Sequence, residues 1–89
     1  MEIIFSKKAQ EDIAYWKKSG NGQVMNRITA LLNDITEHPY TGIGKPEKLK
    51  YALAGSWSRR IDTEHRIVYA VREEENEIHI LALRYHYTK

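Results

Sequence analysis

The last strand-like segment of the chain, LALRYHYTK, carries four large polar or titratable side chains in a row: Arg84, Tyr85, His86 and Tyr87. His86 is the candidate for proton transfer, because imidazole is the side chain whose unperturbed titration lies nearest neutral pH. A single histidine near a chain end is more commonly an exposed side chain without a chemical role. Strict alternation places Arg84 and His86 on one face of a strand and the two tyrosines on the other. Chemistry at this segment therefore needs partners from elsewhere in the chain.

Glu47 and Lys50 lie three residues apart, after the turn-rich stretch YTGIGKP. Nearby cations favour the charged form of a carboxylate, and such a carboxylate can act as a general base at neutral pH. A segment such as EKLK is also typical of a solvated strand edge. Glu47 is a candidate base only if an acid such as His86 accompanies it.

The stretch WSRRIDTEHR predicts a tight hairpin that carries two arginines. If residues 62–64 form the loop, Ile61 pairs with His65 and Arg60 lies directly opposite Arg66 on one face of the sheet. Like charges in that position destabilise a sheet, and a bound phosphate would relieve the repulsion. Two alternatives are a four-residue loop that separates the arginines, and neutralisation by the two acids of the loop.

The remaining candidates for a site are weaker. His38, His65 and His79 lack metal-ligand spacing, and Trp16 and Trp57 are interpreted as core residues. The chain has no Ser-His-Asp order, and GIGK lacks the flanking strand and helix of a phosphate loop. A carboxylate, several cations and a histidine remain. This set suits metal-independent RNA cleavage through the 2′-hydroxyl, with one group accepting a proton, cations stabilising the phosphorane and another group donating a proton.

The composition bounds the class of protein. Eighty-nine residues predict a single domain, 1–89, and the formal charge of +2 is too small to indicate a nucleic-acid binder by itself. The basic residues are regional, however. Within residues 44–66 and at one later neighbour the basic side chains are Lys45, Lys48, Lys50, Arg59, Arg60, Arg66 and Arg84. The absence of cysteine and of any apolar run near 20 residues predicts a soluble, cytoplasmic protein without a membrane partner.

The elements that must position these residues follow from periodicity and turn signals. Ser6 and Asn21 are expected to cap two antiparallel helices, the second ending at His38. Extended segments are expected at residues 2–5, 48–53, 57–61, 66–71 and 78–84. The order β-α-α-β-β-β predicts an α+β domain in which two helices pack on one face of an antiparallel sheet. The other face remains for function.

The stretches GKPEKLK, LAGSWSRRIDTEHRIVYAV and RYHY, in this order and at these separations, resemble the YoeB/Txe toxins of the RelE-like superfamily. The resemblance covers essentially the whole chain. It implies a RelE-like fold and a ribosome-dependent endoribonuclease that cuts mRNA without a cofactor or metal. It also implies a cognate antitoxin as partner, and it leaves open whether the toxin forms a homodimer.

The resemblance implies acid–base roles for residues on two separate segments of the chain. Glu47, the acid of GKPE, resembles the general base, and His86 of RYHY resembles the general acid. Tyr87 is implied to orient the substrate or the acid. The family pattern commonly stops at this tyrosine, whereas Thr88 and Lys89 follow here, which argues against a role for a terminal carboxylate beside Tyr87.

The implied cation roles use three residues. Arg66, the arginine of EHR, is implied to stabilise the transition state, while Lys50 and Arg60 are implied to contact phosphate. A non-catalytic toxin of the ParE type, or an RNA-binding module of the same fold, is the alternative. Neither would need Glu47 and His86 together. An endoribonuclease that acts on free RNA is a third interpretation.

Overall fold

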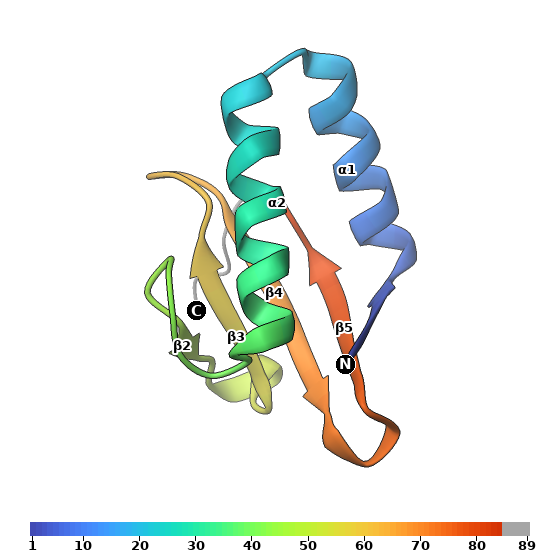
Figure 1. The fold of residues 1–89 in the computed structure, drawn as a ribbon, viewed down its shortest axis with the longest axis vertical. Helices are drawn as coiled ribbons and strands as arrows, with labels where there is room; N and C mark the ends of the chain where they lie inside the picture. Colours follow the sequence, from blue (N-terminus) through green and yellow to red (C-terminus); the bar gives the residue numbers. More distant parts are fainter. Residues whose placement is uncertain (85–89) are drawn as a thin grey trace.

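The computed structural model describes residues 1–84 and contains two helices and a five-stranded sheet (Figure 1). The helices are α1 (Lys7–Ser19) and α2 (Gly22–Glu37), and the strands are β1 (Glu2–Phe5), β2 (Glu47–Lys48), β3 (Ser56–Arg60), β4 (Arg66–Arg72) and β5 (Glu77–Ala82). Short 3-10 turns occupy Tyr51–Leu53 and Glu73–Glu75. The order of strands across the sheet is β1-β5-β4-β3-β2. The predicted α+β class is confirmed, and the short strand β2 precedes the three strands that end the predicted order β-α-α-β-β-β.

Both predicted helix caps are present. The Ser6 hydroxyl accepts the backbone N–H of Ala9 at 3.0 Å, and the Asn21 side chain accepts that of Val24 at 3.1 Å. These bonds satisfy backbone donors that have no partner within the first turn of a helix. Between the helices Gly20 adopts φ +72°, so α1 ends in the left-handed conformation that glycine adopts without steric cost. The second helix ends at Glu37, with His38 as its C-cap, so it stops before His38-Pro39 as expected.

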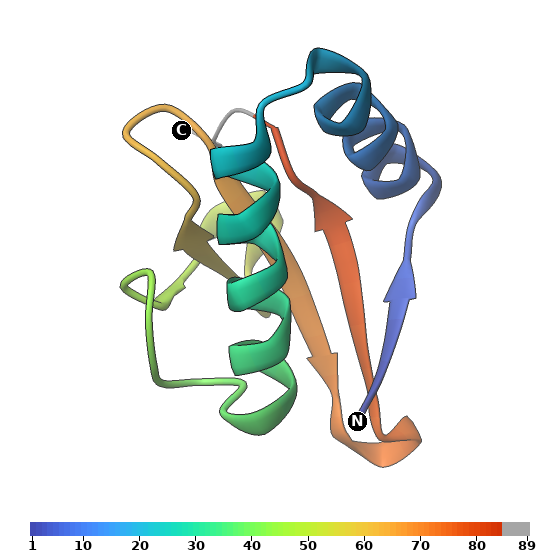
Figure 2. The same ribbon diagram turned by 45° about the horizontal axis from the view of Figure 1, so that its top comes forward.

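The two helices cover one face of the sheet, and the core lies between the helices and the sheet (Figure 2). The apolar spacing predicted for α2 is confirmed, because all four of its expected positions are buried: Val24, Ile28, Leu31 and Ile35. Strands β4 and β5 contribute Ile67, Tyr69, Ile78 and Ile80 from the sheet side. Trp16 belongs to this core and Trp57 packs against it, which confirms their interpretation as core residues.

The sheet is mixed rather than wholly antiparallel. Strands β2 to β5 pair antiparallel, whereas β1 pairs parallel with β5, with Ile3 aligned with Ile78. The chain leaves β1 through both helices and returns to β5 only after three other strands. A crossover of this length permits parallel pairing, for which a hairpin is too short.

Two predicted strands are shorter than expected. The extended segment predicted at 48–53 ends early, because the Leu53 N–H bonds the Lys50 carbonyl at 3.2 Å and so closes a 3-10 turn. The strand predicted to reach Arg84 stops at Ala82. Beyond it, both backbone groups of Leu83 bond side chains of α1 instead of a neighbouring strand. The sheet ladder therefore cannot continue.

Candidate functional site

The β3–β4 hairpin brings two arginines face to face. Arg60 is paired with Arg66 across the strands, and the Ile61 N–H donates to the His65 carbonyl at 2.9 Å. Asp62 Oδ1 closes the turn by accepting the backbone N–H groups of Glu64 and His65. The predicted loop of residues 62–64 and the predicted register are confirmed. The alternative with a four-residue loop is wrong.

Glu47 joins the arginines from the next strand. It pairs with Ser58 across β2 and β3, and alternation along β3 puts Ser58 and Arg60 on the same face. Glu47 Oε1 lies 3.7 Å from Nη1 of Arg66. The Glu47 side chain is 67% exposed and that of Arg66 is 24% exposed. We call Glu47, Arg60 and Arg66 the acid–arginine face.

The charges of the acid–arginine face are not balanced. Asp62 is used within the turn, and Glu64 lies 3.7 Å from the His65 ring, so no ion pair is recorded between these loop acids and either arginine. Within residues 1–84 Arg60 has no ion pair, and its side chain is exposed. An exposed carboxylate beside two guanidinium groups can accept a proton while the guanidinium groups bind an anion such as a phosphate.

The other predicted site residues are not joined to this face by the described contacts. The Lys50 side chain is exposed just before the 3-10 turn, and in the described part of the chain it makes no ion pair with Glu47. His86 and Tyr87 lie outside the described residues. The structure therefore brings together three of the six predicted residues.

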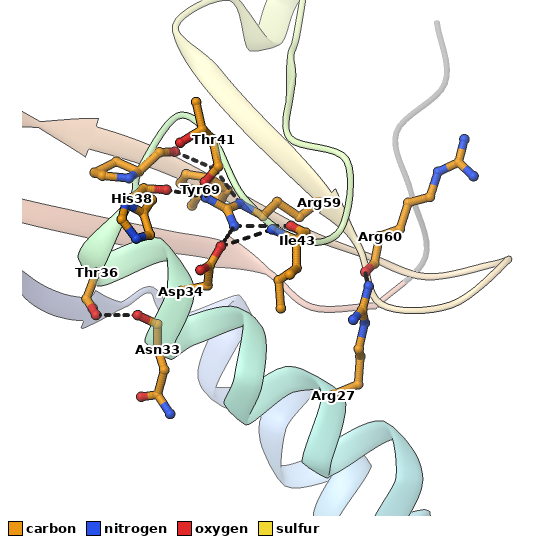
Figure 3. A network of polar contacts seen from close by, with 11 residues as sticks. Arg27, Asn33, Asp34, Thr36, His38, Thr41, Ile43, Arg59, Arg60 and Tyr69 are labelled. Carbon is orange, nitrogen blue, oxygen red and sulfur yellow. Dashed lines mark hydrogen bonds and ion pairs between the residues drawn. The ribbon is translucent and has the colours of Figure 1, made fainter.

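Sequence reasoning missed the role of Arg59, which it counted only among the regional basic side chains. Arg59 is fully buried and uses all five of its N–H groups (Figure 3). Its partners are the carboxylate of Asp34 at 2.5 Å, the hydroxyl of Tyr69 at 3.0 Å, and the backbone carbonyls of His38, Thr41 and Ile43. We call Arg59, Asp34 and Tyr69 the loop anchor. Arg60, the next residue, points away from it (Figure 3).

The loop anchor holds the segment that leads into β2. Asp34 also accepts the Ile43 N–H at 3.0 Å, and the Tyr69 hydroxyl donates to the Pro39 carbonyl at 2.7 Å. The hydrogen bond from Arg59 lowers the pKa of Asp34, against an opposing effect of burial. Burial raises the pKa of Tyr69, against the hydrogen bond from Arg59. The same contacts that satisfy a buried cation therefore shape the loop before Glu47.

Two glycines allow this loop to approach α2 and β3. A Cβ at Gly42 would lie 1.9 Å from Asp34 Oδ2, and one at Gly44 would lie 2.7 Å from Cδ2 of Leu31. Both residues have positive φ, at +125° and +83°. The Gly44 carbonyl accepts the Arg60 N–H at 2.7 Å, which fixes the loop to the end of β3. Glycine is thus required where the loop passes over the anchor.

Side chains that could bind a metal are scattered over the described part of the chain. No cluster of three or more His, Cys, Asp or Glu side chains there has the arrangement of a metal site. His79 lies 2.8 Å from Glu77, and the His65 ring packs edge-on against Trp16 with ring centroids 4.8 Å apart. No helix within residues 1–84 is both long and apolar enough to cross a bilayer.

Comparison with known proteins gives one consistent result. A family model described as a YoeB-like toxin of a bacterial type II toxin–antitoxin system matches residues 5–87. Toxin YoeB of Escherichia coli strain K12 is 42% identical over 87 residues, covering 98% of this chain and 100% of that protein.

Two solved structures are similar over almost their whole length. A YoeB/ParE toxin from Agrobacterium tumefaciens has a TM-score of 0.92 at 33% identity, covering 98% of this chain and 100% of that one. The chain matched in a YoeB-YefM complex from Staphylococcus aureus has a TM-score of 0.85 at 44% identity, with 98% of each chain covered.

Proposed function

Because this chain belongs to the family of YoeB-like toxins of bacterial type II toxin–antitoxin systems, we propose that it is a ribosome-dependent endoribonuclease that cuts mRNA. Its activity would be held in check by a cognate antitoxin, by analogy with the YoeB-YefM complex. The proposed partners are thus the ribosome, mRNA and a small antitoxin, and the proposed location is the cytoplasm.

The contact between Glu47 and Arg66 carries this proposal. The two charged groups lie 3.7 Å apart, beside a second arginine, Arg60, that has no ion pair within residues 1–84. A purely binding surface for an anion gains nothing from a carboxylate in its centre, since the carboxylate repels the phosphate. A general base next to phosphate-binding cations is the arrangement that cleavage by the 2′-hydroxyl requires.

In the proposed reaction the RNA supplies its own nucleophile. Glu47 takes the proton of the 2′-hydroxyl, whose oxygen attacks the adjacent phosphorus. Arg66 stabilises the dianionic pentavalent species, while Arg60 and Lys50 hold the phosphate oxygens. His86 donates a proton to the departing 5′-oxygen, and Tyr87 orients the substrate or this acid.

The bonds formed and broken in this reaction determine the ends of the two RNA fragments. The upstream fragment ends in a 2′,3′-cyclic phosphate and the downstream fragment in a 5′-hydroxyl. Neither a metal nor water takes part in this step.

Analysis of the cleaved ends tests the proposed reaction. Programmed ribosomes are incubated with the protein, and the ends are determined with a low concentration of EDTA that leaves the ribosomes intact. We expect a 5′-hydroxyl on the downstream fragment and undiminished cleavage. A 5′-phosphate, or loss of activity with the chelator, would show that a different chemistry operates and that the roles of Glu47 and His86 are wrong.

Substitution of the proposed acid or base should lower the cleavage rate by a factor that can be stated in advance. Glu47→Ala and His86→Ala should each lower the cleavage rate by about 10² to 10⁴, because a positioned acid or base contributes a factor of that size. Binding to ribosomes, measured by co-sedimentation, should persist in both variants.

A comparison of substrates separates the proposal from its alternatives. The wild-type protein is given free mRNA and mRNA on programmed ribosomes under the same conditions. Cleavage on ribosomes alone supports the proposal, and equal cleavage of both indicates a ribosome-independent nuclease. Absence of cleavage in both, with growth inhibition retained, favours the non-catalytic ParE type.

A further inference from the structure

Two side chains of helix α1 hydrogen-bond the backbone immediately after β5. The Leu83 N–H donates to Asp12 Oδ2 at 2.8 Å, and the Leu83 carbonyl accepts the Nε1–H of Trp16, also at 2.8 Å. Leu83 is fully buried, Asp12 is 3% exposed and Trp16 is 5% exposed. We call Asp12 and Trp16 the Leu83 clamp. It satisfies both backbone groups of one residue with side chains from one helix.

The clamp is supported on both sides along α1. Asp12 and Trp16 lie four residues apart and so share one face of the helix. Lys8, one turn earlier, places Nζ 2.8 Å from Asp12 Oδ1 and 2.9 Å from Oδ2. The Tyr15 ring lies under the Arg84 guanidinium, with Cζ 3.5 Å from the ring centroid. Helix α1 thus contacts Leu83 and Arg84 through three side chains, and Lys8 supports one of them, Asp12.

Ending a strand on a buried carboxylate carries a desolvation cost. Removing Asp12 from water has a cost that its bonds to Leu83 and Lys8 must offset, whereas another residue of sheet ladder or a water-exposed turn would avoid that cost. The clamp instead sets both the position and the direction of the chain as it leaves β5. No residue of the acid–arginine face takes part in it.

The proposed general acid, His86, follows Leu83 by only three residues. A chain of three residues spans at most about 11 Å, so the place where the backbone is fixed limits where the imidazole can reach. We propose that Asp12 and Trp16 are positioning residues for the catalytic C-terminal segment, acting through the backbone of Leu83. This inference rests on the function proposed above.

The proposal predicts which kinetic constant changes. Glu47, Arg60 and Arg66 lie on β2, β3 and β4, and no bond of Asp12 within residues 1–84 reaches them, so loss of an Asp12 bond should leave substrate binding at that face unchanged. Trp16 does contact the β3–β4 turn, through the His65 ring. A misplacement of about 1 Å in a catalytic group can cost about 10² in rate. Loss of one clamp bond should therefore lower kcat by about 10- to 100-fold while KM changes less than about threefold.

The experiment compares three variants on programmed ribosomes, with rates expressed per folded molecule from circular dichroism. Asp12→Ala removes the acceptor for the Leu83 N–H and should show the loss in kcat. Asp12→Asn keeps an oxygen in the same place and should retain kcat within about threefold, since the amide can still accept this bond. Val24→Ala is the control for stability, because it opens a cavity at a buried position of α2. It should lower the melting temperature without lowering kcat.

Trp16→Phe provides an independent measurement, and it also serves if Asp12→Ala does not fold. It keeps an aromatic ring in the core and removes the donor to the Leu83 carbonyl, so kcat should again fall. The inference is overturned if the folded variants keep the wild-type kcat, if they change KM rather than kcat, or if Val24→Ala lowers kcat by the same factor. A wild-type protein that does not cleave at all would instead refute the proposed function.

Discussion

Arg60 and Arg66 face each other across β3 and β4 with only one carboxylate, Glu47, recorded beside them among the described residues. Like charges directly opposite in a sheet cost stability, and an ion pair with an exposed carboxylate returns only about 0 to 1 kcal/mol. Arg66→Ala should therefore leave the melting temperature unchanged or raise it slightly. Cleavage should fall by about 10² to 10³, the usual loss when a group that stabilises a transition-state oxyanion is removed.

Thermal melting and cleavage on programmed ribosomes measure the two effects of Arg66→Ala separately. Arg59→Met is the contrasting variant, because it leaves the carboxylate of Asp34 and four other acceptors without their common donor. It should lower the melting temperature far more than Arg66→Ala. If Arg66→Ala unfolds the protein as Arg59→Met does, Arg66 is a structural residue and its proposed role is wrong.

The adjacent arginines show what could be predicted at the level of residues. The register that opposes Arg60 and Arg66 follows from the length of the loop and the alternation of strands. Alternation was visible in the sequence, whereas the sequence left open whether the loop has three or four residues. The burial of Arg59 was missed, although alternation puts it on the same face as the core residues Trp57 and Ile61. Four of its five partners lie 16 to 25 residues earlier in the chain, so no local pattern indicates them. Asp12 was missed for the same reason.

At the level of elements, the segment from His38 to Gly44 is shaped by the loop anchor rather than by its own hydrogen bonds. Asp34 has its pKa lowered mainly by the hydrogen bond from Arg59. A group with a lowered pKa contributes stability above its unfolded pKa of about 4 and loses it as the pH falls through the folded value. The melting temperature of the wild type should exceed that of Asp34→Asn at pH 7, and the difference should shrink below about pH 4.

Thermal melts of both proteins between pH 7 and pH 2 give this difference directly. Glu73→Gln is a suitable control, since the exposed Glu73 side chain accepts a hydrogen bond from the Tyr40 hydroxyl and has no other recorded partner within residues 1–84. A difference between wild type and Asp34→Asn that stays constant across the whole range would mean that ionised Asp34 does not stabilise the loop.

The pairing of elements shows the limit of local patterns. Local patterns identified both helices by their helical apolar spacing, β3, β4 and β5 by alternation, and β1 by its β-branched and aromatic residues. They could not say which strand β1 pairs with, because the Glu2–Glu77 register joins residues at opposite ends of the chain. They also extended β5 to Arg84, because nothing near Leu83 in the sequence indicates that Asp12 and Trp16 bond its backbone. Contacts distant in sequence decided each of these points.

At the scale of the whole molecule, the helices and the acid–arginine face lie on different sides of the sheet. The helices cover one face (Figures 1 and 2). The backbone pairing of β2, β3 and β4, with alternation along each strand, places Glu47, Arg60 and Arg66 on the other face. A partner that binds only the outer surfaces of α1 and α2 would leave this face accessible. Inhibition by the proposed antitoxin therefore requires that its chain cover the acid–arginine face or displace the C-terminal segment.

A disordered antitoxin segment that folds on binding can cover such a face, because a small partner then contacts a large surface. Hydrogen exchange of the complex should show slower exchange in the peptide covering residues 44–50, or faster exchange at residues 85–89 if the end is displaced. The free protein gives the reference, and cleavage on programmed ribosomes should be lost in parallel. If exchange slows only in α1 and α2 and cleavage persists, the partner does not act at this site. In such a complex Glu47 and His86 would still be free to react.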